Sequence, residues 1–125
     1  MRGFDQSEES VLRSRENFIN AGLNISVEKR DLFSDEIFKH EATKKWVFVN
    51  PPYGIRIKGD GVFPAYFSRI LTQIQNKWDP EMTGMIIPSA RLKKGFKIPV
   101  GFKLIKKLEF LNGGLRVCFL VVQKG

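Results

Sequence analysis

Short apolar segments of strand length alternate with segments of helical periodicity through this chain. Strands are predicted at residues 3–5, 23–31, 46–49 and 84–90, and helices are predicted after Ser7 and from Pro64. This alternation is typical of an α/β layer fold with a mostly parallel sheet. Ligands of such sheets bind beyond the carboxyl ends of the strands. Polar residues that directly follow a predicted strand are therefore the first candidates for a functional site.

Both predicted helices have recognisable boundaries. Ser7 is a favourable N-cap, and Gly22 is a typical helix stop. Pro64 suits the first position of the second helix, because its missing N–H would be unpaired there in any case. The apolar faces are predicted to contain Val11, Leu12, Phe18 and Ile19 in the first helix, and Phe67, Ile70, Leu71 and Ile74 in the second.

The last part of the chain is predicted to form a β-hairpin. Two apolar runs, residues 102–111 and 115–123, flank the tripeptide Asn112-Gly113-Gly114. Asn-Gly between apolar runs favours a tight turn, because these residues accept the positive φ angles that the turn needs. We therefore expect an antiparallel hairpin to follow the mostly parallel part of the sheet.

Length and composition indicate one domain over residues 1–125, with an ordinary hydrophobic content of 42%. No apolar run reaches the ~18 residues of a membrane span, and the first residues lack the apolar region of a secretory signal. Cys118 lies in an apolar run and is expected to be a reduced core residue. Together with the single His40 it gives no recognisable metal-site spacing. We expect a cytoplasmic protein with no bound metal and no membrane partner.

The positive charge is concentrated in the second half of the chain. The net charge is +8, and residues 63–125 carry eleven basic and three acidic residues. Seven basic residues and no acidic residue lie between Arg91 and Lys107. This segment is either a solvated face or a phosphate-binding patch, because clustered Lys and Arg gain affinity for nucleic acids by counterion release. The candidate nucleic-acid-binding residues are Arg91, Lys93, Lys94 and Lys97.

Three polar residues stand at the ends of successive predicted strands. Asp5, Asp31 and Asn50 each come directly after, or at the end of, an apolar segment. Taken singly, each Asp is more simply interpreted as a turn or helix-capping residue. Three such residues in succession favour a shared crevice. We therefore expect all three at the same edge of one sheet.

The third predicted strand, Trp46–Val49, ends in an unusual corner, Asn50-Pro51-Pro52-Tyr53. The strand reads as buried, and sheet pairing must stop at the prolines because neither has an N–H. Their carbonyls and the Asn50 side chain remain as acceptors, and Tyr53 adds an aromatic face. A planar molecule with an NH2 group would suit this corner. The alternative is a purely structural turn, because Asn-Pro and Pro-Pro are common turn formers.

The corner resembles the signature of the amino methyltransferases, which use S-adenosylmethionine to methylate exocyclic or amide nitrogens. Residues 3–23 and 27–33 resemble the second strand, its helix and the third strand of that family. Residues 101–122 are similar to the end of the THUMP-associated N2-guanine RNA methyltransferases. The resemblance covers nearly the whole chain and implies a Rossmann-like class I methyltransferase fold.

The resemblance also implies roles for individual residues. Asp5 would bind the cofactor ribose hydroxyls, and Asp31, followed by Leu32, would contact the adenine. Asn50 and the Pro51 carbonyl would orient the target nitrogen, with Pro52 and Tyr53 completing the catalytic motif. Tyr53 would stack on the base. The expected reaction is methyl transfer to an exocyclic base nitrogen, most simply guanine N2 of ribosomal RNA.

The sequence departs from the family in one respect. The family's first strand carries a Gly-rich loop around the methionine part of the cofactor, and no such segment precedes Gly3. We therefore expect a truncated, partial catalytic domain that binds S-adenosylmethionine weakly or not at all. In the family that strand separates the second strand from the Asn-Pro-Pro-Tyr strand. These two strands are left to pair with each other, to pair with another chain or to remain open, which favours dimerisation or association with the missing N-terminal portion.

Other functions remain open from sequence alone. The chain is also compatible with methylation of DNA adenine N6 or of a protein glutamine, although the basic second half favours nucleic acid over protein. A third interpretation is a remnant without activity that only binds RNA or a partner.

Overall fold

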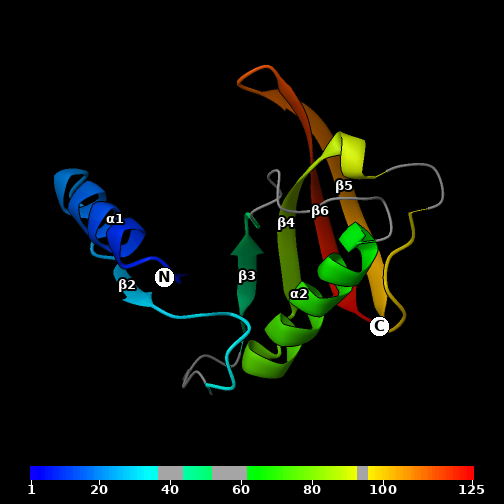
Figure 1. The fold of residues 1–125 in the computed structure, drawn as a ribbon, viewed down its shortest axis with the longest axis horizontal. Coiled ribbons are helices and arrows are strands. Elements are labelled where there is room, and N and C mark those ends of the chain that lie inside the picture. The colour runs from blue at the N-terminus through cyan, green and yellow to red at the C-terminus, as the bar shows by residue number, and fades with distance from the viewer. Residues whose placement is uncertain (37–43, 52–61, 93–95) are drawn as a thin grey trace. The chain divides into compact units, whose positions relative to one another are not determined.

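The structure is a computed structural model, and it describes residues 1–36, 44–51, 62–92 and 96–125. The chain divides into two compact units, Met1–Ile37 and Phe38–Gly125. Each unit has its own sheet and is described separately (Figure 1). No helix in these described segments is long and apolar enough to cross a membrane.

The N-terminal unit is a strand–helix–strand unit. Strand β1 (Arg2–Asp5) pairs in parallel with β2 (Ser26–Lys29), and helix α1 (Glu8–Asn20) connects them. The register joins Asp5 to Lys29, so both strands end at the same edge. The predicted strand 23–31 is shortened at both ends to the four residues that face β1.

Helix α1 has the predicted boundaries. The Ser7 hydroxyl accepts a hydrogen bond from the Ser10 N–H at 3.3 Å. At the other end Gly22 has φ +71, and its N–H donates to the Ile19 carbonyl at 3.0 Å. The predicted apolar face is only partly buried, because Val11 is in the core whereas Ile19 is 75% exposed.

The C-terminal unit is a four-stranded mixed sheet with α2 (Val62–Trp78) on one face (Figure 1). Its strands are β3 (Trp46–Val49), β4 (Met82–Pro88), β5 (Phe102–Asn112) and β6 (Leu115–Lys124), in the order β3-β4-β6-β5. β3 is parallel to β4, and β6 is antiparallel to both β4 and β5. A short 3-10 helix, η1 (Ser89–Arg91), follows β4.

The predicted C-terminal hairpin is confirmed. Asn112 pairs with Leu115, and the two residues between them, Gly113 and Gly114, have φ values of 57° and 83°. Two consecutive positive φ angles are what a type I′ turn requires. A β-bulge between Leu104 and Lys106 is the one irregularity in the β5–β6 register.

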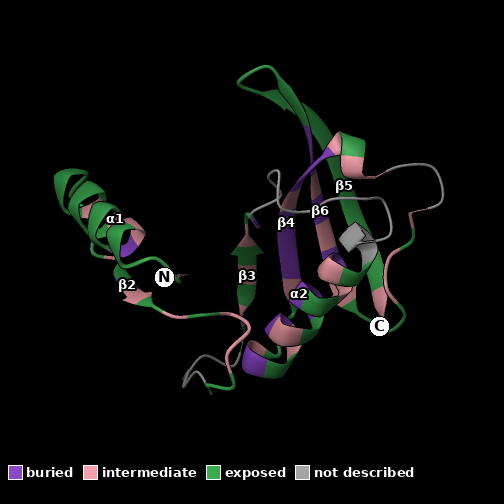
Figure 2. Cartoon of the chain, in the orientation of Figure 1, coloured by how far each residue is buried: buried purple, intermediate pink, exposed green. Residues whose placement is uncertain are grey.

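The core of this unit lies between α2 and one face of the sheet. The four predicted residues of α2 (Phe67, Ile70, Leu71 and Ile74) are all buried. Alternate residues of β4 and β6 on the α2 side are 2% exposed or less: Met85, Ile87, Cys118, Leu120 and Val122. Figure 2 shows this buried layer along β4 and the inner side of α2. Cys118 is a free, buried thiol, as expected.

The prediction that Trp46–Val49 is a buried strand is wrong in part. β3 exists with the predicted bounds, but Trp46 and Phe48 are 61% and 63% exposed. β3 is at the edge of its sheet, and these two residues point to the face opposite α2. Val47 and Val49 point to the α2 side and are half-buried. An all-apolar sequence could not reveal that, within the described C-terminal unit, α2 covers only the face of Val47 and Val49.

Candidate functional site

The carboxylate of Asp5 is held by the start of α1. Its Oδ1 accepts a hydrogen bond from the Ser7 N–H at 2.8 Å, and its main-chain carbonyl accepts one from the Arg30 N–H at 2.9 Å. The second bond continues the β1–β2 ladder by one step beyond Lys29. It therefore ties the end of β1 to the residue that precedes Asp31.

Asp31 is held in a matching way. Its Oδ1 accepts a hydrogen bond from the Phe33 N–H at 2.9 Å. Its carbonyl accepts bonds from the Ser34 N–H at 3.2 Å and the Ser34 hydroxyl at 2.8 Å. Leu32 lies in this turn and is half-buried. Asp5 and Asp31 thus share one edge of a parallel strand pair, and each carboxylate has one oxygen oriented by the N–H two residues ahead.

The turn interpretation of the two aspartates is therefore correct locally, because both carboxylates receive a main-chain N–H. These hydrogen bonds occupy only one oxygen of each carboxylate. The second oxygen, Oδ2, has no hydrogen-bond partner within the described segments for either residue. Both side chains retain an acceptor for hydroxyl or amino groups.

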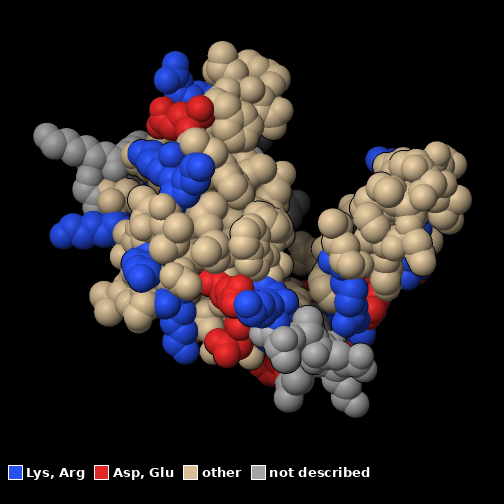
Figure 3. Space-filling model, turned by 180° about the vertical axis from the view of Figure 1, so that it is seen from behind, with Lys and Arg blue, Asp and Glu red and all other residues tan. Residues whose placement is uncertain are grey.

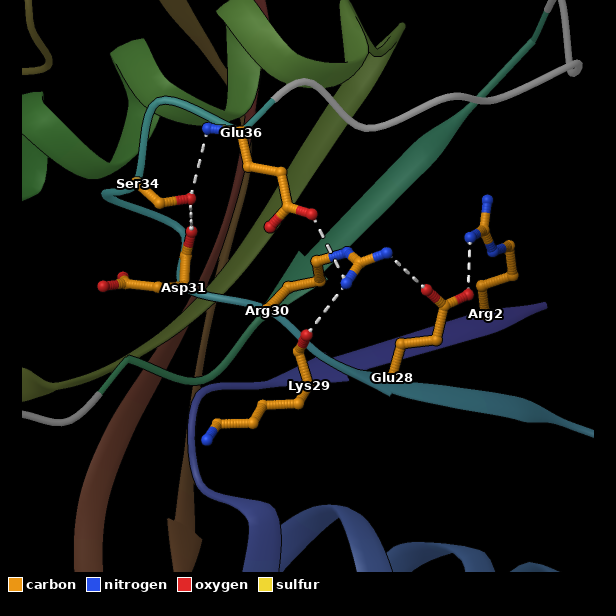
Figure 4. Close-up of polar contacts among 7 residues, drawn as sticks. All are labelled: Arg2, Glu28, Lys29, Arg30, Asp31, Ser34 and Glu36. Atoms are coloured by element: carbon orange, nitrogen blue, oxygen red, sulfur yellow. Dashed lines mark hydrogen bonds and ion pairs between the residues drawn. The ribbon is translucent and has the colours of Figure 1, made fainter.

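An ion-pair network runs beside this edge (Figure 4). Glu28 pairs with Arg2 at 2.7 Å and with Arg30 at 3.0 Å, and Arg30 also reaches Glu36 at 3.4 Å. The hydrogen bond from Arg2 is the main reason that the pKa of Glu28 is lowered. Exposed pairs of this kind contribute little stability each. Their geometric effect is larger, because Arg30 fastens β2 to the turn that carries Asp31.

Sequence reasoning missed Arg30. It stands in the run Glu28-Lys29-Arg30-Asp31, in which two basic residues lie between two acidic ones. A run of this kind is most simply a solvated strand. No sequence signal connected Arg30 to Glu36, six residues further along.

Asn50 directly follows β3, as predicted, and its side chain is exposed. Pro51 is buried. Pro52 and Tyr53 lie outside the described residues, so the stacking platform stays a prediction. Because β3 and β4 are parallel, both strands end toward the same edge of the sheet, where Asn50 follows Val49 and Ser89 follows Pro88. Val49 pairs with Met85, so β4 continues beyond the level of Asn50 before it reaches Ser89.

Ser89 is a second residue that the sequence analysis passed over. It follows β4 as Asn50 follows β3, and its hydroxyl oxygen is buried without a hydrogen-bond partner among the described residues. The strand-end criterion would have found it if β4 had been predicted to end at Pro88 instead of residue 90.

The basic segment begins at this same edge. Arg91 closes η1 and is half-buried, while Lys97 is exposed. Lys93 and Lys94 lie outside the described residues. Further along, Lys103, Lys106 and Lys107 are exposed on β5.

The strand-end residues thus fall into two sets. Asp5 and Asp31 share one edge in the N-terminal unit, and Asn50 shares an edge with Ser89 and η1 in the C-terminal unit. The described strands form two sheets, and β1 does not pair with β3. The expectation of a single crevice that contains all three residues remains a prediction. The sequence left three arrangements for the strands now seen as β1 and β3: pairing with each other, pairing with another chain, or open edges. The described sheets do not show the first of these.

Comparisons with known proteins define the fold. Neither a protein-family model nor a curated protein matches this chain. Among solved structures, TrmN from Thermus thermophilus is similar with a TM-score of 0.68 and 21% identity, covering 99% of this chain and 36% of that chain. The chain has a class I methyltransferase fold. It spans only about a third of TrmN, and identity at this level establishes the fold alone.

Two further structures with this methyltransferase fold are similar. The putative methyltransferase yhhF from Escherichia coli gives a TM-score of 0.59 at 13% identity, covering 98% of this chain and 63% of that chain. The Pyrococcus abyssi tRNA (uracil-54, C5)-methyltransferase in complex with S-adenosyl-L-homocysteine gives 0.56 at 13% identity, covering 97% and 28%.

Proposed function

We propose that this chain is part of a methyltransferase that transfers a methyl group from S-adenosylmethionine to an exocyclic nitrogen of an RNA base, with guanine N2 of ribosomal RNA as the target. The observation that carries the proposal is the position of Asn50-Pro51 at the carboxyl end of a strand in a class I methyltransferase fold. Strand ends of this kind are where ligands of such sheets bind.

The N-terminal unit suits the nucleoside part of the cofactor. Ribose hydroxyls and the adenine amino group are hydrogen-bond donors, and Asp5 and Asp31 each present a carboxylate with one oxygen already oriented. Asp5 would hold the ribose, and Asp31 with Leu32 would hold the adenine. The bound cofactor supplies an electrophilic methyl group on a sulfonium.

The corner after β3 would hold the target base. The Asn50 side-chain carbonyl and the Pro51 carbonyl would accept the two hydrogens of an NH2 group and direct its lone pair toward the methyl group. Pro51 is buried, which would restrict the movement of its carbonyl. In a duplex the base must first leave the helical stack, and stacking on Tyr53 would compensate by about 1–3 kcal/mol.

Exposed lysines favour nucleic acid over a protein glutamine, and the names of two similar structures favour RNA over DNA. The described part of the basic segment is accessible at Lys97, Lys103, Lys106 and Lys107. Two of the similar structures are, by their names, a tRNA methyltransferase and a putative tRNA (m1A22) methyltransferase from Streptococcus pneumoniae, the latter with a TM-score of 0.57 at 13% identity. The target nucleotide rests on the resemblance of residues 101–122 alone.

The cofactor half of the proposal is tested by NMR titration of the 125-residue chain with S-adenosylmethionine. We expect weak binding, with shifts of the Ser7, Phe33 and Ser34 amides. Asp31→Ala should remove these shifts. Asp35→Ala is the matched control, because Asp35 is exposed in the same segment and is not predicted to contact the cofactor. Shifts that persist in Asp31→Ala would contradict the assignment.

The RNA half is tested separately by fluorescence anisotropy with a single-stranded RNA. We expect affinity to fall steeply with salt, and Lys93→Glu, Lys94→Glu and Lys97→Glu together to weaken binding at least tenfold. Lys29→Glu is the control, because Lys29 is outside the basic segment. Unchanged affinity would leave that segment as a solvated face. RNA binding without any cofactor shift would instead favour the remnant without activity.

A further inference from the structure

The carboxyl edge of the C-terminal sheet rises in steps from β3 to the β5–β6 hairpin. β3 ends at Val49, which pairs with Met85, and β4 continues for three more residues to Pro88. Pro88 pairs with Val117 of β6, and the hairpin extends further to its turn. At a rise of ~3.3 Å per residue, the end of β4 lies about 10 Å beyond the level of Val49. Asn50 therefore stands at the foot of a step that β4 and β6 form.

Two arginines stand at the top of this step. Arg116 directly precedes Val117, so it is level with Ser89, one position beyond the last residue pair of β4 and β6. Arg91 is the last residue of η1, and η1 packs against β6. The fold thus brings together, around the start of η1, two arginines that are far apart in the sequence.

The described chain leaves the polar groups at this position largely unsatisfied. The Arg91 side chain is half-buried and makes no hydrogen bond or ion pair with the described residues. The Ser89 hydroxyl is buried and also has no partner there. Arg116 has one ion pair, to Glu109 at 3.9 Å, and its side chain is 70% exposed. A partly desolvated guanidinium without a partner is costly, and a buried hydroxyl without one needs an explanation. An anion with several oxygen atoms would supply acceptors for all three side chains.

The charges around this position favour an anion. Residues 82–125 contain nine basic residues and a single acid, Glu109. Seen from behind, the border of the C-terminal unit below the hairpin tip is lined mainly by Lys and Arg (Figure 3). The pair between Glu109 and Arg116 is long and exposed to water, so it is weak. Little negative charge of the C-terminal unit therefore competes with an anion for the two arginines.

The position of the arginines indicates which anion this is. Ligands of such sheets lie beyond the carboxyl ends of the strands, and the proposed target base enters at Asn50. In a nucleotide the ribose separates the base from the phosphate, so a base at the foot of the step places a backbone phosphate near its top. Arginine suits this contact, because its planar guanidinium binds two phosphate oxygens at once. A protein segment over the top of the step would stand in the path of the base to Asn50, which makes a phosphate of the substrate the simpler occupant.

We propose that Arg91 and Arg116 bind a backbone phosphate next to the target nucleotide, with the Ser89 hydroxyl as an additional hydrogen-bond donor. This inference rests on the proposed function, because it takes the corner after β3 as the position of the target base. It adds a contact that recognises the RNA strand instead of the base. A phosphate held there fixes the position of the backbone relative to Asn50, and it selects a nucleotide over a free base or a glutamine side chain.

Two trinucleotides of the sequence uridine–guanosine–uridine test this contact by NMR titration of the 125-residue chain. One has its natural phosphodiesters, and in the other both linkages are neutral methylphosphonates. We expect the charged trinucleotide to bind about tenfold more tightly and to shift the amides of Ser89, Arg91 and Arg116. In the double variant Arg91→Gln/Arg116→Gln the two trinucleotides should bind equally. Lys103→Gln/Lys124→Gln is the matched control, because it removes the same charge from exposed residues at the opposite edge of the sheet and should keep the difference.

A second pair of variants separates geometry, charge and base recognition. Arg91→Lys/Arg116→Lys keeps both charges but loses the paired hydrogen bonds of each guanidinium, and it should weaken the charged trinucleotide about threefold. It also tests the contact if circular dichroism shows that the glutamine variant does not fold. Asn50→Ala tests the proposed function separately, because it should weaken both trinucleotides by the same factor and leave their ratio unchanged.

Three results would overturn this inference. Equal binding of the two trinucleotides to the unchanged chain, or no binding of either, would show that no phosphate is held. An equal loss in the lysine control and the arginine variant would reduce the contact to general attraction by a basic surface. Inorganic phosphate that binds as tightly as the charged trinucleotide would make this a site for free anions. If Asn50→Ala affects neither trinucleotide while the arginine result holds, the proposed position of the base is wrong and the phosphate contact stands.

Discussion

The two faces of the four-stranded sheet have similar sequences, but near β3 their environments differ. On the α2 side, Met85, Ile87 and Leu120 are almost completely excluded from water. On the other side, Trp46 and Phe48 are 61% and 63% exposed although they are at least as apolar, whereas Val117 further along that face is 0% exposed. Composition alone therefore does not decide which residues form the core. The presence of a covering element decides it, and within the described C-terminal unit helix α2 covers one face only.

This difference has an energetic consequence. An apolar side chain contributes to stability in proportion to the area that it removes from water, about 25 cal/mol per Å². The residues on the α2 side make that contribution within the chain. Trp46 and Phe48 on the other face make little of that contribution within the C-terminal unit. The following three experiments test this contrast, beginning with the largest expected effect.

Thiol reactivity should separate the two faces most strongly. Burial is the main cause that raises the pKa of the Cys118 thiol, while nearby Lys107 acts in the opposite direction. In a Leu108→Cys variant, both faces carry one cysteine. We expect iodoacetamide to modify Cys118 about a thousandfold more slowly than the new cysteine, because modification requires opening of the core. Mass spectrometry of the peptides gives both rates in one sample.

The control for this experiment is the same variant in denaturant, where the two rates should become equal. Similar rates in the native protein would mean that the α2 side opens readily, and the contrast between the faces would be lost.

Substitution of a phenylalanine on each face should change the free energy of unfolding by different amounts. Phe67 on α2 is buried and packs edge-on against Phe96, with the two ring centroids 5.3 Å apart. Phe67→Ala should lower the free energy of unfolding by about 3–5 kcal/mol, because it leaves a cavity. Phe48→Ala should lower it by about 1 kcal/mol or less. Urea unfolding of the three proteins measures both values. A loss from Phe48→Ala as large as that from Phe67→Ala would show that the open face is already covered.

The smallest expected effect concerns Gly84, which lies beneath the rings of Phe48 and Phe119. Gly84→Ala places a methyl group against Phe48 and Phe119, and we expect a loss of about 1 kcal/mol. Most of this loss should disappear when Phe48→Ala is also present, because one of the two rings is gone. A double-mutant cycle in urea measures the coupling. Additive effects would contradict the close stacking over Gly84.

Much of the local structure was predictable from short segments. The caps of α1, the buried face of α2 and the hairpin turn all follow from residues close together in the sequence, namely Ser7 and Gly22, Phe67 to Ile74, and Asn112 to Gly114. The strand-end positions of Asp5 and Asn50 were also predictable, because an apolar run has a visible end.

The failures concern contacts between distant residues. Arg30 ties β2 to the turn of Asp31 through ion pairs with Glu28 and Glu36. No periodicity in the sequence connects these residues. Ser89 was missed because the length of β4 depends on its pairing with β6. Whether Asp5 and Asn50 meet in one crevice depends on how two separate sheets are combined, which no local pattern encodes.

The sequence by itself determined the elements of this protein, their order and the chemistry of its candidate site. Each of these depends on turn residues, caps and apolar periodicity, which act over a few positions. Only the tertiary structure decided which apolar residues are buried. Trp46 and Phe48 have the composition of a core, but they lie on an edge strand of the described C-terminal sheet, on the face that α2 does not cover. Burial depends on what packs against a side chain, and the sequence of the strand does not specify that neighbour.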